Sequence, residues 1–188
     1  MKRLALLALL LAGCAGAPLP PDWQTNAHQA LEAFKRNYLA GDTRAAETEF
    51  RRAKSELART GRGDLLARAE LTRCAVQTAS LQFDDCPGFE ALPSDVRSEE
   101  TAYAEYLAGR AQRAATDDAL SRLVGLGVQF KTGGISPAGI AQAVEIASAQ
   151  GWRRPLLAWL GVQVKRAEDA GDSETAARIR RRIGLISD

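Results

Sequence analysis

The side chains best suited to chemistry in this 188-residue sequence are few and lie far apart. His28 is the only histidine, so any nucleophilic arrangement of the Ser-His-Asp or Cys-His kind must use it. Asp84 and Asp85 are adjacent carboxylates, whereas a glycosidase needs two carboxylates set across a cleft. We therefore predict a surface histidine, solvated loop carboxylates and no catalytic residue, so the protein is not expected to be an enzyme.

Glycines gather between Gly125 and Gly134, in a stretch that could hold phosphate if it were a P-loop. A P-loop places glycine directly before Lys-Ser or Lys-Thr, but here Phe130 precedes Lys131-Thr132. Gly125-Leu126-Gly127 does not extend into the dinucleotide-binding fingerprint either. We interpret the stretch as a flexible junction between helices and predict no cofactor.

The amino-terminal residues have the layout of an export signal. Lys2 and Arg3 precede an unbroken apolar run over residues 4–12, which Gly13 and Cys14 follow. A basic start, a short apolar core and small residues are typical of secretory signals. The apolar run is too short to cross a bilayer, which needs about 20 residues. The segment is therefore predicted to direct export rather than to span a membrane.

The last four residues of this segment, Leu11-Ala12-Gly13-Cys14, resemble the lipobox of bacterial lipoproteins at every position. The resemblance implies removal of a signal peptide, residues 1–13, and attachment of fatty acyl chains such as palmitate to Cys14. Two or more acyl chains anchor a protein firmly to a membrane. Ala15 follows the cysteine, and in Gram-negative lipoproteins a residue other than Asp there favours the periplasmic face of the outer membrane. The alternative is an ordinary secreted protein with a stray cysteine.

The charge of the chain changes once the signal is removed. The formal net charge of +2 comes from Lys2 and Arg3, so the remaining 23 basic side chains equal the 23 acidic ones. Nucleic-acid binding requires a strongly basic surface, and we therefore expect no nucleic-acid partner.

The three cysteines fit an exported protein. With Cys14 assigned to lipid, Cys74 and Cys86 remain, and an even remainder in an oxidising compartment predicts a disulfide. The alternative is a pair of buried free thiols. A metal site is not expected, because two thiols do not complete a tetrahedral set and His28 lies far away in the sequence.

The composition favours helices, since Ala, Leu and Arg are abundant and aromatic residues are sparse. Residues 14–21 are predicted to form a Pro-rich, lipidated tether, and residues 22–188 a single helical domain. Apolar residues at helical spacing, with Gly, Pro and Asp at the boundaries, predict about eight helices and no strand. The predicted helices span residues 22–40, 43–59, 65–82, 95–108, 111–124, 137–151, 155–170 and 173–183.

A four-residue pattern recurs within this domain. Tyr38-Leu39-Ala40-Gly41 reappears as Tyr106-Leu107-Ala108-Gly109, 68 residues later, which is twice 34. A period of 34 belongs to the tetratricopeptide repeat, a helix–turn–helix unit. The segment from Gly41-Asp42 through Ala46, Phe50 and Ala53 resembles that family best. Gly171-Asp172, followed by Ala176, is a third and weaker copy.

The copies also depart from the family pattern. Arg180 replaces the aromatic residue of the last copy, Asp118 stands at that position in the middle copy, and the spacing from Gly109 to Gly171 breaks the period. The predicted fold is all-α: antiparallel helix pairs in a short tetratricopeptide-like solenoid or, alternatively, an irregular helical array.

The resemblance implies a function in binding. Stacked helix pairs create a concave face that holds a segment of a partner. We expect a lipid-anchored envelope scaffold with a groove of aromatic and Arg side chains, assisting assembly of an outer-membrane or periplasmic complex. The alternatives are a structural lipoprotein without a groove and an enzyme acting on peptidoglycan or lipid. Arg178, Arg181 and Arg182 share one helix face, which is either solvated or in contact with an acidic partner or lipid headgroups.

Overall fold

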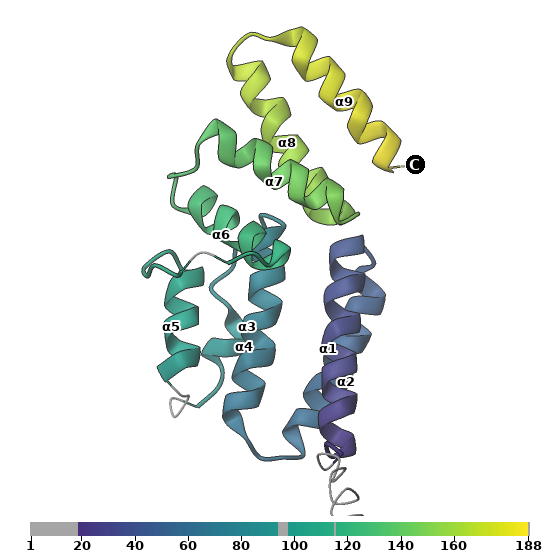
Figure 1. Ribbon diagram of the computed structural model, residues 1–188, viewed down its shortest axis with the longest axis vertical. Coiled ribbons are helices and arrows are strands. Elements are labelled where there is room, and N and C mark those ends of the chain that lie inside the picture. Colours follow the sequence, from purple (N-terminus) through teal and green to yellow (C-terminus); the bar gives the residue numbers. More distant parts are fainter. Residues whose placement is uncertain (1–18, 94–97, 115, 188) are drawn as a thin grey trace, which may run out of the picture.

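The computed structural model describes residues 19–93, 98–114 and 116–187. This part of the chain contains nine α-helices and no strand, which confirms the all-α prediction (Figure 1). The helices are α1 (Asp22–Ala40), α2 (Thr43–Ala58), α3 (Gly63–Ala79), α4 (Pro87–Glu90), α5 (Ser98–Leu107), α6 (Ala119–Lys131), α7 (Pro137–Ala149), α8 (Arg153–Asp169) and α9 (Ser173–Ser187).

Helices α1 and α2 pack as an antiparallel pair around a two-residue turn. Gly41 has φ +96°, a left-handed conformation that ends α1 and that other residues rarely adopt. The Asp42 side chain then accepts a hydrogen bond from the backbone N–H of Ala45 at 2.9 Å, which caps α2. Across the pair, the rings of Phe34 and Phe50 lie 4.9 Å apart and are fully buried. The turn and the aromatic contact together hold the two helices antiparallel.

Helices α8 and α9 repeat this arrangement at the carboxyl end. Gly171 has φ +72°, and the side chain of Asp172 accepts a hydrogen bond from the N–H of Thr175 at 2.9 Å. Ala176 is the only fully buried residue of α9. Arg180 is exposed and forms an ion pair with Glu168 of α8, in place of the aromatic contact of the first pair. Helices α7 and α8 form a further antiparallel pair.

The middle part of the chain differs from the predicted repeat. Gly109, with φ +80°, follows the end of α5, and among the described residues the next helix begins only at Ala119. The predicted start of the helix over residues 111–124 is therefore wrong, whereas residues 119–124 do lie in a helix, α6. Asp118 explains the late start, because its carboxylate accepts a hydrogen bond from the N–H of Ser121 at 2.7 Å and caps α6.

Gly125 and Gly127 lie inside α6, so the predicted flexible junction at these residues is also wrong. A Cβ at Gly127 would lie 2.3 Å from the carbonyl oxygen of Thr78 in α3. The glycine is there because two helix backbones approach each other closely, a reason that local sequence does not reveal.

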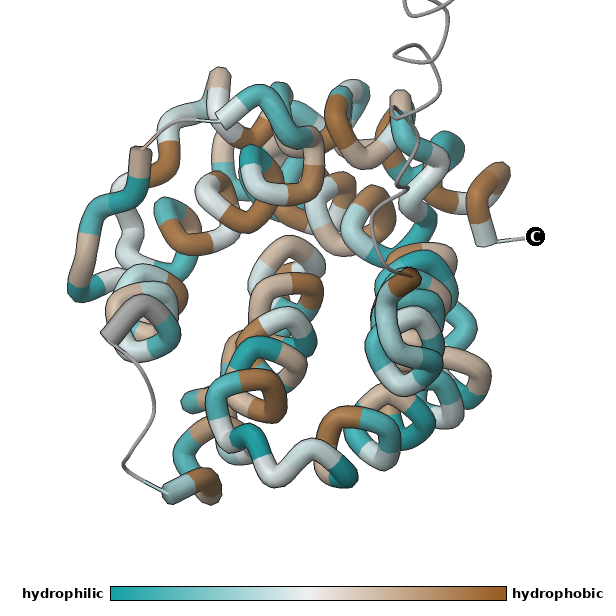
Figure 2. The backbone as a smooth tube through the Cα atoms, turned by 60° about the horizontal axis from the view of Figure 1, so that its bottom comes forward, coloured by the Kyte–Doolittle hydropathy of each residue, from teal (hydrophilic) through white to brown (hydrophobic). Residues whose placement is uncertain are grey.

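The hydrophobic core consists of two clusters that meet at α3. Ala69 and Val76 of α3 pack with α1 and α2, while Leu71 and Cys74 on its other side pack with α5 to α8. Hydrophobic and hydrophilic residues alternate along the helices, as expected where each helix has one buried face (Figure 2). The central helix α3 therefore contributes to both clusters, and α8 also contacts α1.

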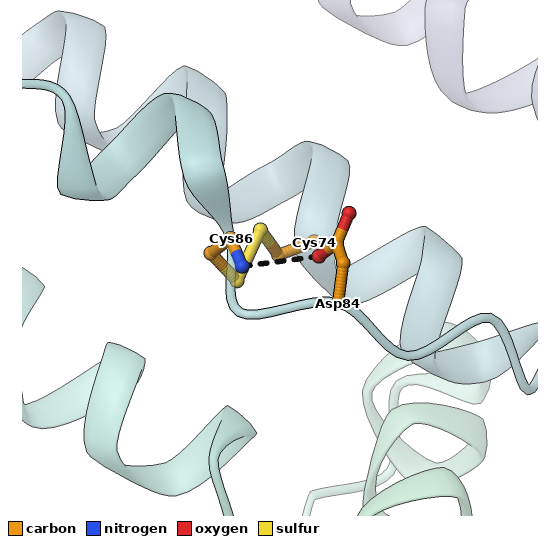
Figure 3. Close-up of a disulfide and its surroundings, with 3 residues drawn as sticks. All are labelled: Cys74, Asp84 and Cys86. Atoms are coloured by element: carbon orange, nitrogen blue, oxygen red, sulfur yellow. Dashed lines mark hydrogen bonds between the residues drawn. A yellow bond between two sulfur atoms is a disulfide. The ribbon is translucent and has the colours of Figure 1, made fainter.

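A disulfide fastens the segment after α3 to that helix (Figure 3). Cys74 of α3 is bonded to Cys86, with 5.7 Å between their Cα atoms, which confirms the predicted pairing. The carboxylate of Asp84 accepts a hydrogen bond from the backbone N–H of Cys86 at 3.0 Å. Phe89 of the short helix α4 is buried beside them, so the loop is held by a covalent bond and by packing.

Candidate functional site

A groove runs between α7 and α9 across the surface of α8. It consists of two cavities of about 610 and 510 Å³, which share Gln163 of α8 and Arg182 of α9. One stripe of α7 lines both cavities at helical spacing: Pro137, Ile140, Ala141, Val144, Glu145 and Ser148. Because the stripe extends from Pro137 to Ser148, along almost the whole helix, the groove is about 17 Å long at 1.5 Å per residue.

The sequence of α7 explains why this stripe is open. Ser136 caps the helix by accepting a hydrogen bond from the N–H of Gly139 at 3.0 Å, and Pro137 occupies the first turn, where its missing N–H costs nothing. Ala143 and Ala147 are buried in the core, whereas Ala141 faces the groove with a short side chain.

The floor and the second wall come from the last helix pair. Leu160 of α8 is fully buried and Ala167 is 9% exposed, which makes the floor apolar. The wall is the face of α9 with Thr175, Arg178 and Ile179. Since α9 buries only one residue completely, part of its apolar face stays available to a ligand.

The charges around the groove are mostly positive. Arg166, Arg178 and Arg182 line it, and none of them forms an ion pair within the part of the chain that the structure describes. Arg182 instead donates a hydrogen bond to the hydroxyl oxygen of Ser148 at 3.1 Å, across the groove from α9 to α7. Asp172 and Glu145 are the acidic residues of the lining.

Asp172 mainly caps α9, and its carboxylate also interacts with the charge of Arg178. Its hydrogen bond from the backbone N–H of Thr175 lowers the pKa of its carboxyl group. The carboxylate is therefore already engaged at the start of α9. Arg178 donates a hydrogen bond to the hydroxyl oxygen of Thr175 at 3.1 Å. An anionic ligand in the groove would therefore meet three guanidinium groups that form no ion pair among the described residues, two of which already donate to a hydroxyl.

The disulfide and turn residues singled out in the sequence do not come together in one site. Cys14 lies outside the described residues, and Cys74 and Cys86 form the disulfide. Of the turn residues, only Asp172 lines the groove, while Gly41, Asp42, Gly109 and Gly171 shape helix ends elsewhere. His28 is exposed on α1 and lines neither cavity of the groove.

The sequence predicts only part of the groove. It singled out Arg178 and Arg182, but not Arg166, whose distance in sequence concealed its position beside them. The expected aromatic lining is absent from the described groove, whose floor is aliphatic. Trp159 is fully buried in the core, and its indole N–H donates to the carbonyl oxygen of Ala79 at 3.1 Å.

Two other features bear on chemistry. Ligand atoms of Cys74, Asp84 and Cys86 lie within 4.8 Å of one another, but the disulfide leaves neither sulfur as a thiolate that could bind a metal. In the described part of the chain, no helix has both the length and the apolar character needed to cross a membrane.

Comparison with known proteins returned no matching protein-family model, no matching curated protein and no matching solved structure. The function must therefore be argued from the groove and the sequence of this chain.

Proposed function

We propose that this protein is a lipid-anchored scaffold of the bacterial cell envelope, and that its α7–α9 groove holds an acidic amphipathic helix of a partner protein. The lipid would be attached at Cys14, as the Leu11-Ala12-Gly13-Cys14 lipobox implies, and would keep the groove at the periplasmic face of the outer membrane. The observation that carries the proposal is the apolar floor bordered by Arg166, Arg178 and Arg182.

The shape of the groove favours a helical occupant. All the elements around it are helices, so they offer no sheet edge to which an extended peptide could add as a strand. A partner helix of three to four turns is about 20 Å long and matches α7. Its apolar stripe would pack on Pro137, Ala141 and Ile179, the lining residues whose apolar side chains keep exposed surface, as in other helix-in-groove complexes.

The charges favour acidic residues on the side of that stripe that faces α8 and α9, since the charged residue of the α7 wall is Glu145. Glu or Asp side chains of the partner would pair with Arg178 and Arg182 on α9 and with Arg166 on α8. The lipid anchor confines the groove to one membrane surface and so raises its effective concentration for a partner at that surface. A complex of modest intrinsic affinity would therefore form in the envelope.

The test is site-specific photo-crosslinking of the full-length protein in cells of its own host. A photoreactive residue replaces Ala141 in the groove or, as a control, the exposed Ser55 of α2. We expect Ala141 alone to capture one partner, with the crosslink mapped by mass spectrometry to an acidic helical segment. The double variant R178E/R182E should abolish this capture.

Two outcomes would contradict the proposal. Capture from Ala141 of only the proteins also captured from Ser55 would leave the groove without a partner and favour a structural lipoprotein. Capture that survives R178E/R182E would show that the arginines do not recognise the partner. The anchor is tested separately by Cys14→Ser, which should move the protein from the membrane to the soluble fraction.

A further inference from the structure

The geometry points to a second binding site, for a sugar-sized ligand that carries a carboxylate or phosphate, in a cavity between α5, α6 and residues 113–114. The cavity has a volume of about 350 Å³, at the lower end of the range of small-molecule sites. It lies apart from the α7–α9 groove, because the two linings have no residue in common. The inference therefore does not depend on the proposed scaffold function.

Aromatic and cationic side chains form one wall of this cavity. The rings of Tyr103 and Tyr106 on α5 are stacked, with 5.9 Å between their centroids. The guanidinium of Arg113 lies over the ring of Tyr103 at 4.6 Å. This cation–π contact holds the positive charge at the wall of the cavity. The combination of aromatic and Arg side chains that was expected for a partner groove occurs here instead.

Hydrogen-bond donors converge on the cavity from several elements. Arg122 and Gln129 project from α6, and Gln142 comes from α7. The side chains of these three residues and the hydroxyls of Tyr103 and Tyr106 have no hydrogen-bond partner in the described part of the chain. They are therefore free to bind a ligand.

The tyrosines act as donors at neutral pH. Burial raises the pKa of Tyr103 to about 12, and it also raises the pKa of Tyr106, so both keep their protons. Asp118 is the acidic group that acts on Tyr103, but its carboxylate accepts the hydrogen bond that caps α6. Since the lining itself contains two arginines and no carboxylate, it suits a ligand rich in acceptor oxygens.

The floor of the cavity limits the size of the ligand. Val124 and Leu126 are buried beneath it, and Gly125 leaves room for the hydroxyl of Tyr106, which a Cβ would approach to 3.1 Å. The carboxamides of Gln129 and Gln142 can both donate to and accept from sugar hydroxyls. The two guanidinium groups match a carboxylate or a phosphate. A ligand with one hexose ring and one carboxylate or phosphate would match these side chains.

Ligand-observed NMR and calorimetry on the purified full-length protein in detergent test the site. The probes are glucuronate, which carries a carboxylate, glucose 6-phosphate, which carries a phosphate, and neutral glucose. We expect saturable binding of at least one oxyanion probe with a Kd of about 1 mM or tighter, and at least about tenfold weaker binding of glucose. The oxyanion probe with the lower Kd shows whether the natural ligand carries a carboxylate or a phosphate.

Two variants of lining residues test whether the probes bind in this cavity. Arg113→Gln removes one guanidinium, and Gln142→Glu places a carboxylate on an exposed lining position. Each should weaken oxyanion binding by about tenfold. The matched control is Arg110→Gln, because Arg110 is exposed, pairs with Glu105 at 2.6 Å and does not line the cavity. It should bind like the parent protein.

Three results would overturn the inference. They are the absence of saturable binding by both oxyanion probes, glucose binding as tight as theirs, and unchanged binding by both R113Q and Q142E. Partner capture from Ala141 is measured independently, so failure here is distinguishable from failure of the scaffold proposal.

Discussion

Arg154, at the start of α8, contacts both the ring and the backbone of Tyr38 at the end of α1, although 116 residues separate them in the sequence. Its guanidinium lies 4.3 Å from the centroid of the Tyr38 ring, and its Nε donates to the carbonyl oxygen of Tyr38 at 2.7 Å. Its Nη2 donates to the hydroxyl oxygen of Thr43 at 2.7 Å, just past the turn. One side chain thus ties the carboxyl-terminal half of the protein to the turn of the amino-terminal helix pair.

Replacing Arg154 with Met should lower the free energy of unfolding by about 2 kcal/mol. The variant loses two charge-assisted hydrogen bonds and a cation–π contact while keeping much of the aliphatic stem. Urea unfolding followed by circular dichroism measures the change. Arg153→Met is the matched control: Arg153 is exposed, so its loss should cost no more than about 0.5 kcal/mol. Equal stability of the two variants would show that the contacts of Arg154 with Tyr38 and Thr43 do not contribute to the free energy of unfolding.

Local sequence was sufficient to predict several parts of this fold. The turns at Gly41-Asp42 and Gly171-Asp172 depend on a left-handed glycine and a capping carboxylate within a few residues, and these features are visible in the sequence. The disulfide between Cys74 and Cys86 followed from counting cysteines. In each case, the stabilising contacts are short-range or the choice of partners is small.

The parts that were mispredicted depend on long-range contacts. The prediction of a junction at Gly127 is wrong because the Thr78 carbonyl that requires a glycine there belongs to another helix. The groove could not be predicted from the sequence because its lining residues, such as Ile140, Arg166 and Arg182, come together only when α7, α8 and α9 pack. Burial against a distant element overrides local propensity in such places.

Two glycine-to-alanine substitutions within helices should have opposite effects. A Cβ at Gly127 would meet the Thr78 carbonyl at 2.3 Å, and backbone cannot move aside easily, so Gly127→Ala should destabilise the protein by about 2 kcal/mol. A Cβ at Gly161 of α8 meets no atom within 4 Å, so Gly161→Ala should stabilise by about 0.5–1 kcal/mol through helix propensity.

Thermal unfolding of the two variants beside the parent protein measures both effects. Gly161→Ala is itself the control for the substitution, since it adds the same methyl group where there is space. If Gly127→Ala also raised the midpoint, α3 and α6 could not approach as closely as the structure shows.

Reduction of the Cys74–Cys86 disulfide should destabilise the fold by about 3 kcal/mol, the loop-closure value for a segment of this length. Urea unfolding with and without a thiol reductant gives the difference. The double variant C74A/C86A should match the reduced protein and should not respond to reductant. An unchanged urea midpoint on reduction would mean that packing of Phe89 alone holds the loop on α3.

Alkaline pH should unfold this protein through its tyrosines. The sequence has three, and burial raises the pKa of Tyr38 and of Tyr103 from 10.0 to about 12 and also raises the pKa of Tyr106. Because the folded pKa exceeds the unfolded value, the stabilisation is complete below pH 10 and is lost as the pH rises toward 12.

Absorbance of the phenolate and circular dichroism, recorded together from pH 9 to pH 12, test this dependence. We expect little phenolate at pH 10, followed by its appearance together with the loss of helical signal. Tyr38→Phe removes one buried phenol that must ionise during alkaline unfolding. The midpoint pH of the alkaline transition should therefore be higher in this variant than in the parent protein, once any difference between their stabilities at neutral pH is allowed for. Titration of all three phenols near pH 10 in a fully helical protein would show that water reaches Tyr38 and Tyr103 freely, and the packing of α1 and α5 around them would then be wrong.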